Sequence, residues 1–106
     1  MSYRLTVRHG PKVDRERAET LDEAIEIAKR YVRGSRRREA VEGIGRRYEA
    51  AAQIAVRIEL KGPGGRAGLD VRGDGGVIAW TGRVVRTELA GDDPYEALAQ
   101  RLSVGP

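Results

Sequence analysis

The stretch YEAAAQIAVRIEL, residues 48–60, carries the clearest pattern in this sequence. Its even positions are apolar: Tyr48, Ala50, Ala52, Ile54, Val56, Ile58 and Leu60. Its odd positions are small, polar or charged: Glu49, Ala51, Gln53, Ala55, Arg57 and Glu59. Because side chains alternate between the two faces of a β-strand, the pattern predicts one long strand with a buried face and an open face.

Weaker strand patterns lie on both sides of this stretch. Tyr3–Val7 alternates, His9-Gly10-Pro11 is a turn, and Lys12–Ala18 returns as a second strand of poor apolar content. After Leu60, a glycine-rich loop over residues 61–68 and a turn over residues 73–76 bound a short strand at Leu69–Arg72. A further strand runs from Val77 to about Leu89, where a β-bulge near Gly82 lets Ile78 and Trp80 face the core.

Two amphipathic helices complete the pattern. The first begins with a capping box made by Thr20 and Glu23, and Gly34 is a typical C-terminal stop. Its apolar stripe consists of Leu21, Ala24, Ile25, Ala28, Tyr31 and Val32. Asp93 caps the second helix, Pro94 occupies its first turn, and Leu98 and Leu102 lie on its apolar side. Residues 35–46 fit either a short helix capped by Ser35 or a basic loop.

The order of these elements predicts the fold class. Strands that follow one another, with only two helices among them, indicate an α+β domain. We expect two layers: a four- or five-stranded, mainly antiparallel sheet with both helices on one face. At 106 residues the chain forms a single domain, residues 1–106, and its core is aliphatic because it has no Phe and one Trp.

The positive charge is concentrated in one segment. Residues 29–47 carry eight bases against two acids, whereas the whole chain carries only +4. Clustered arginines are the electrostatic signature of nucleic-acid binding, and the candidates are Arg36, Arg37, Arg38, Arg46 and Arg47. A solvated arginine-rich surface without a partner is the alternative interpretation.

The sequence offers no catalytic constellation. It has no Cys and a single His, His9, in a turn, so neither a nucleophile–base pair nor a metal site with His or Cys ligands is indicated. The glycine-rich loop at 62–68 runs into a strand instead of a helix N-terminus, which favours a hairpin over a phosphate-binding loop. We therefore expect no enzyme activity, no cofactor and no metal.

The N-terminal residues lack the apolar core of a signal peptide, and no stretch is long enough to span a bilayer. We expect a cytoplasmic protein without a membrane partner. The excess of Arg over Lys and the absence of Asn fit a high-GC bacterial source, and a heat-adapted one fits as well.

Two resemblances bear on this sequence. The motifs RLTVR (4–8), VDRER (13–17), TLDEA (20–24) and LDVRGDG (69–75) resemble an uncharacterised family of small actinobacterial proteins with no assigned function. The order helix, three strands, helix is similar to that of a double-stranded-RNA-binding domain. That family opens its last helix with a lysine-rich segment, whereas this chain has Asp92-Asp93-Pro94, so the second resemblance is one of topology alone.

Two functional hypotheses follow. The first is a non-catalytic protein-interaction module, most simply a homodimer, because the core is thin and the strand over residues 48–60 has an open face. Ala51, Gln53, Ala55 and Arg57 are its candidate contacts. The alternative is a nucleic-acid-binding domain that uses the basic segment 29–47.

Overall fold

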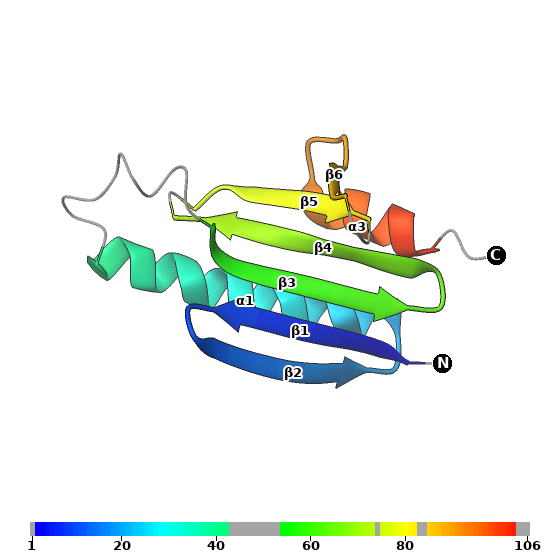
Figure 1. The fold of residues 1–106 in the computed structure, drawn as a ribbon, viewed down its shortest axis with the longest axis horizontal. Coiled ribbons are helices and arrows are strands. Elements are labelled where there is room, and N and C mark those ends of the chain that lie inside the picture. The colour runs from blue at the N-terminus through cyan, green and yellow to red at the C-terminus, as the bar shows by residue number, and fades with distance from the viewer. Residues whose placement is uncertain (1, 43–53, 74, 83–84, 104–106) are drawn as a thin grey trace.

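A computed structural model describes residues 2–42, 54–73, 75–82 and 85–103, and for residues 36–42 it describes the helical backbone alone. The described chain forms one antiparallel sheet of six strands in the order β2-β1-β3-β4-β5-β6, with two helices (Figure 1). The strands are β1 Tyr3–His9, β2 Lys12–Ala18, β3 Ile54–Gly62, β4 Gly65–Arg72, β5 Val77–Thr81 and β6 Thr87–Glu88. The helices are α1 Leu21–Glu42 and α3 Pro94–Ser103. The predicted α+β class is confirmed, with slightly more strands than expected.

The pairing of β1 with β3 joins the two halves of the sheet. Leu5 lies opposite Leu60 and Val7 opposite Ile58, so apolar positions of both strands fall on the same face. The β1–β2 hairpin, including the weakly predicted strand Lys12–Ala18, is attached to the three-stranded meander β3–β4–β5 through this contact. The alternation of β3 is what aligns the halves, because a slip of one residue would expose its apolar face.

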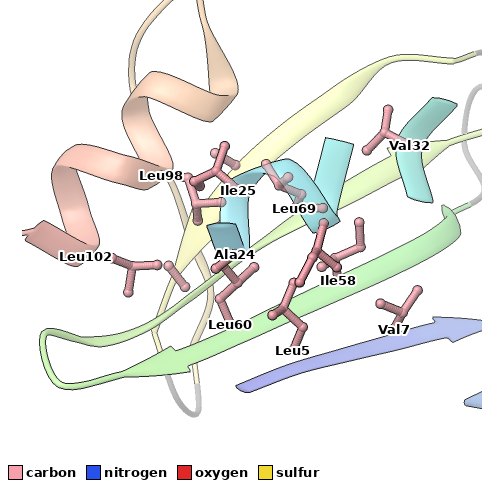
Figure 2. Close-up of a cluster of buried hydrophobic side chains, with 14 of the residues drawn as sticks. Leu5, Val7, Ala24, Ile25, Val32, Ile58, Leu60, Leu69, Leu98 and Leu102 are labelled. Carbon is pink, nitrogen blue, oxygen red and sulfur yellow. The ribbon is translucent and has the colours of Figure 1, made fainter. Parts of the chain in front are cut away.

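Both helices pack on one face of the sheet. In Figure 1 they lie behind the strands, and contacts place α1 on β1, β2 and β3, and α3 on β4 and β5. Figure 2 shows the resulting core, where leucine and isoleucine side chains of the strands meet α1 and α3. Its largest fully buried side chains are Leu5, Val7, Val32, Ile58, Leu60, Leu69, Val71, Leu98 and Leu102. The expected aliphatic core is therefore confirmed.

The helix caps follow the sequence. The backbone N–H of Glu23 donates to Thr20 Oγ1 at 3.1 Å, and the Glu23 carboxylate accepts from the N–H of Glu19 at 3.2 Å. In α3, Asp93 Oδ1 accepts from the N–H groups of Tyr95 (2.9 Å) and Glu96 (3.3 Å). These contacts satisfy amide donors that have no partner inside the helix, which anchors both helices at the predicted residues.

The predicted helix end at Gly34 is wrong. Helix α1 continues without a break to Glu42, so neither a basic loop nor a separate helix begins at Ser35. Val32 lies in the core and Ser35 is buried, and this burial on both sides of Gly34 outweighs the cost of about 1 kcal/mol that glycine imposes inside a helix. A helix of this length is stabilised by its packed face, and propensity alone does not fix its end.

The structure describes only the second half of the predicted long strand. Strand β3 begins at Ile54 and the predicted residues 48–53 lie outside the described residues. Ile54 is exposed although its parity predicts burial, because the register shifts between Ile54 and Val56. That shift is a β-bulge, which turns the start of the strand away from the core.

The strand predicted from Val77 to Leu89 is also wrong in its extent and orientation. Strand β5 ends at Thr81, and the two residues of β6 form a separate short edge. Leu69 lies opposite Ala79, so Ala79 faces the core while Ile78 and Trp80 face away from the helices. No bulge reverses this parity within β5, and any ligand site between helix and sheet would not contain Trp80.

Candidate functional site

The sheet face opposite the helices, which we call the open face, is strongly basic. Paired residues of antiparallel neighbours share a face, so the registers assign its members. The basic members are Arg4, Arg8, Arg15, Arg17, Arg57, Lys61, Arg66 and Arg72, and Arg86 lies over the ring of Trp80. The acidic members are Glu59, Asp70 and Glu88. Nine bases against three acids leave a charge of +6 on the described part of this face.

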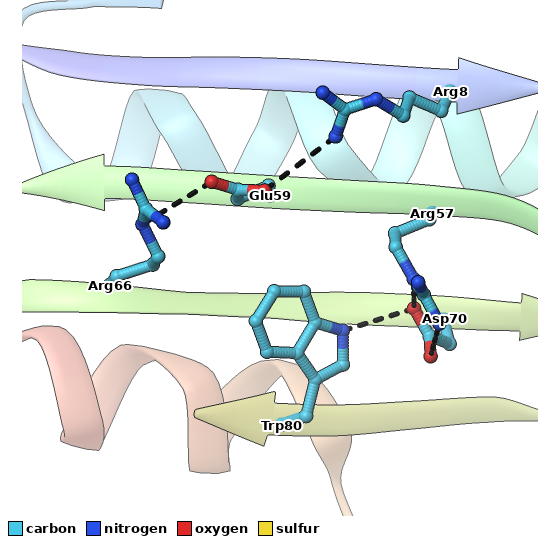
Figure 3. Close-up of polar contacts among 6 residues, drawn as sticks. All are labelled: Arg8, Arg57, Glu59, Arg66, Asp70 and Trp80. Carbon is cyan, nitrogen blue, oxygen red and sulfur yellow. Dashed lines mark hydrogen bonds and ion pairs between the residues drawn. The ribbon is translucent and has the colours of Figure 1, made fainter. Parts of the chain in front are cut away.

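Glu59 is held between two arginines. Figure 3 shows its carboxylate pointing along the sheet to Arg8 on β1 and Arg66 on β4. The Oε2–Arg8 Nη1 distance is 3.7 Å and the Oε1–Arg66 Nε distance is 3.3 Å. The Glu59 carboxylate on β3 thus connects the neighbouring strands β1 and β4. Its single negative charge balances only one of the two positive charges.

Asp70 forms the second polar cluster of the open face. Its Oδ1 accepts from Arg57 Nε at 2.9 Å and from Trp80 Nε1 at 3.0 Å, and its Oδ2 accepts from Arg57 Nη2 at 3.1 Å (Figure 3). The hydrogen bond with Asp70 raises the pKa of Arg57 above its ordinary value. This two-pronged contact gives Arg57 a fixed orientation, since the guanidinium fork matches the carboxylate.

Trp80 is buried on the open face although no described helix covers it. Its side chain lies over Gly68, where a Cβ atom would overlap the indole ring and the carbonyl oxygen of Ile58. Arg86 lies on the ring with its guanidinium carbon 4.8 Å from the ring centre. As a result only 3% of Trp80 is exposed, so this indole is a packing element of the open face.

The remaining bases of the open face have no acidic partner among the described residues. Arg4, Arg15, Arg17, Lys61 and Arg72 are all exposed. Arg17 donates to Ser2 Oγ at 3.3 Å, which is a neutral acceptor. Five positive charges on four neighbouring strands therefore point to solvent without compensation, and a surface of this kind attracts polyanions.

The acidic side chains of the N-terminal hairpin lie on the other face. The Tyr31 hydroxyl donates to Glu16 Oε2 at 2.6 Å, and burial together with this bond raises the pKa of Tyr31 to about 12. A His9 Nε2–Asp14 Oδ2 contact of 2.9 Å lowers the pKa of Asp14. Strand β2 thus carries its acids and Lys12 on the helix side and both its arginines on the open face.

The structure brings together only part of the predicted interaction face. Arg57 lies on the open face as expected, Ala55 stands at the register shift of β3 and packs against the core, and Ala51 and Gln53 lie outside the described residues. Arg57 is tied to Asp70, so its charge is partly neutralised. The basic residues of the other strands were not predicted as part of a site, although Arg4 and Arg8, like Arg15 and Arg17, share one face of their strands by parity.

The predicted basic segment 29–47 is placed only in part. Lys29, Arg30 and Arg33 lie on α1, where they balance Asp22, Glu23 and Glu26. Arg36–Arg38 belong to the helical backbone of the last turns of α1, whose side chains are not described, and Arg46 and Arg47 lie outside the described residues. The described side chains of α1 therefore carry no net charge, in contrast to the open face.

The described residues contain no group of three or more His, Asp or Glu side chains placed to hold a metal ion. Among the same residues, no helix is long and apolar enough to cross a membrane. Comparisons with protein-family models, curated proteins and solved structures found no match to this chain.

Proposed function

We propose that this protein is a non-catalytic nucleic-acid-binding domain whose binding surface is the open face of its sheet. The observation that carries the proposal is the charge of +6 on one uncovered face, including five exposed bases without an acidic partner in the described chain. Phosphates are the natural counter-charge for a flat array of arginines, because the guanidinium fork binds phosphate oxygens in pairs.

The dimensions of the open face fit a nucleic-acid strand. Six strands at about 4.8 Å spacing span roughly 24 Å between the outer strands. A single strand with one phosphate per ~3.4 Å would place about seven phosphates across this distance. The five unpaired bases and the arginine pair beside Glu59 lie on β1–β4, which take up about 14 Å of this distance, so about four of these phosphates lie over them.

The chemistry of the open face favours contacts with the backbone over contacts with bases. The aromatic side chain on its described part is Trp80, which is covered by Arg86. Sequence-tolerant binders of single strands stack bases on exposed aromatic rings, and base-specific readers use grooves. Binding through this face is therefore expected to depend strongly on salt and weakly on sequence.

Self-association through the open face is unfavourable by the same charges. A two-fold contact would set two surfaces of +6 against each other, and like charges in an interface cost free energy. Strand β2, at one edge of the sheet, carries alternating charges from Asp14 to Arg17, which discourages edge-to-edge pairing. A homodimer or a protein partner on another surface stays a prediction, which light scattering at micromolar concentration tests.

Fluorescence anisotropy with labelled oligonucleotides tests the proposal. We expect single-stranded DNA and RNA of mixed sequence to bind at 50 mM salt. If five phosphates are neutralised, the slope of log K against log salt is about −3.5, and affinity falls roughly a hundredfold between 50 and 200 mM salt. Duplexes measured in parallel show whether the open face prefers one form. Absence of binding of every oligonucleotide at 50 mM salt overturns the proposal.

Matched variants locate the surface. The pair Arg4→Gln and Arg15→Gln removes two charges from the open face, and we expect the slope to shrink by about 1.4. The control pair Arg30→Gln and Arg33→Gln removes two exposed charges from α1 and is expected to leave the slope unchanged. Equal losses in both pairs would mean that only net charge matters, which contradicts the proposal.

A third variant tests the basic segment of α1. Replacement of Arg36–Arg38 by Gln is expected to weaken binding less than the open-face pair does. If the triple variant abolishes binding while the open-face pair has no effect, the segment 29–47 is the binding surface and the open-face proposal is wrong.

A further inference from the structure

A hollow of ≈ 460 Å³ lies at the end of the sheet where β3 turns into β4. It is lined by Lys61, Gly62, Gly65, Arg66, Gly82 and Arg101. Lys61 and Arg66 are paired residues of the open face, whereas Arg101 comes from the last turn of α3 on the helix side. Three cations from two layers of the fold therefore converge on one hollow that continues the open face.

The turn and the helix end that form this hollow are held together. Arg101 Nη1 donates to the carbonyl oxygen of Gly64 at 3.0 Å. A Cβ atom at Gly64 would overlap the carbonyl oxygen of Leu102, so glycine is required for the turn to approach α3 this closely. The guanidinium of Arg101 is thereby oriented by the fold before any ligand binds, which lowers the entropic cost of binding.

The lining of the hollow is suited to an anion of more than one charge. Its described lining contains three bases and no acid, and Glu59, which contacts Arg66, occupies only the Nε side of that guanidinium. A guanidinium has five N–H donors, so Arg66 and Arg101 keep donors beyond their protein contacts. The volume lies within the range of about 300–1,000 Å³ that is usual for small-ligand sites, and it exceeds the size of a bare phosphate.

We infer that this hollow binds a terminal phosphate monoester of a nucleic-acid strand whose body lies along the open face. The inference rests on the proposed function. A phosphate monoester has a second pKa of about 6 and carries nearly two negative charges at pH 7, whereas an internal phosphodiester carries one. Three converging cations favour the more highly charged monoester over the diester. The sugar attached to the terminal phosphate would fill the part of the hollow that the phosphate leaves free. None of the described residues that line the hollow is aromatic, so we expect no stacking contact with the terminal base.

Oligonucleotides that differ only at their ends test the inference. One mixed-sequence strand is prepared with a 5′-phosphate, with a 3′-phosphate and with hydroxyl groups at both ends. We expect one phosphorylated strand to bind about tenfold more tightly than the hydroxyl strand, the gain of a charge-assisted bond to an added negative charge. Arg101→Gln is expected to abolish this ratio and to leave the affinity for the hydroxyl strand unchanged, because Arg101 lies off the open face.

A second variant and a small probe keep the inference falsifiable. Lys61 is exposed and has no acidic partner in the described chain, so Lys61→Gln should fold normally and reduce the same ratio. Equal affinities for all three strands, or a ratio that survives in Arg101→Gln, overturn the inference and leave the proposed function standing. Binding of AMP but not adenosine by calorimetry, without any gain for phosphorylated strands, assigns the hollow to a free phosphorylated compound and also overturns it. If no strand binds at all, the proposed function itself fails.

Discussion

Replacement of Asp70 by Ala tests the polar cluster that organises the open face. Asp70 accepts two hydrogen bonds from Arg57 and one from Trp80, and its side chain is 14% exposed. Without the carboxylate, the Trp80 Nε1–H lies beneath Arg86 with no acceptor, which costs about 1–3 kcal/mol. Arg57 is 26% exposed and regains water, so loss of the screened ion pair adds only about 0.5–1 kcal/mol.

These terms predict a loss of about 1.5–4 kcal/mol in the free energy of unfolding. With a urea m-value of about 2 kcal/mol/M, the midpoint of denaturation falls by roughly 0.8–2 M. Trp80 is the one tryptophan of the chain, so its fluorescence in a urea titration reports both unfolding and its own surroundings.

Two variants separate the hydrogen-bond acceptor from the charge. Asp70→Asn keeps an oxygen for Trp80 and loses the ion pair, so it is expected to lose less than half of what Asp70→Ala loses. Glu59→Gln also replaces a carboxylate by an amide, but no buried hydrogen-bond donor depends on Glu59. The urea midpoint of this variant should therefore stay within about 0.3 M of that of the parent. An Asp70→Ala midpoint equal to the parent, or equal losses for Ala and Asn, would refute the reasoning.

Three further outcomes are expected. Glu59→Gln removes one negative charge from the open face and releases the two arginine partners of Glu59. Oligonucleotide affinity should therefore rise several-fold, and the slope of log K against log salt should steepen by about 0.7. Unchanged affinity would count against binding at the open face. Tyr31→Phe should remove the tyrosine that ionises near pH 12 from the ultraviolet titration, because burial and Glu16 raise the pKa of Tyr31 to about 12. In the parent, the stability that the raised pKa contributes to the folded state is lost between pH 10 and 12 as the phenol ionises. Asp14→Asn should lower the melting temperature at pH 6 but not at pH 2. The bond with His9 lowers the pKa of Asp14, and the stabilisation by this bond is lost as the carboxylate is protonated at low pH. A difference in melting temperature that persists at pH 2 would contradict this.

The parts of the fold that were predicted correctly depend on local rules. The alternation of Val56, Ile58 and Leu60 is a property of any half-buried strand, and the caps at Thr20 and Asp93 need only neighbouring residues. The parts that were wrong depend on contacts between distant residues. Helix α1 passes Gly34 because Val32 and Ser35 on its two sides are buried, and β5 ends at Thr81 although the sequence continues with strand-forming residues.

The candidate site was predicted only in part for the same reason. Arg57 was found because it lies within one strongly periodic strand, whereas Ala55 falls at the register shift of that strand. The bases of β1, β2 and β4 become one surface only through the pairing of Arg4 with Lys61 and Arg17, and of Lys61 with Arg66. Runs of charge along the chain pointed to residues 29–47, because linear clustering is visible in a sequence and clustering across strands is not.

The amino-acid sequence alone determined the α+β class, the aliphatic core and the starts of both helices, since these follow from periodicity and from capping chemistry between near neighbours. The tertiary structure decided where the charges of β2 point, how long α1 is, and which side of the sheet holds Trp80. The physical reason is register. A shift of one residue in any strand reverses every side chain on it, so the basic open face exists only when five pairings are set at once.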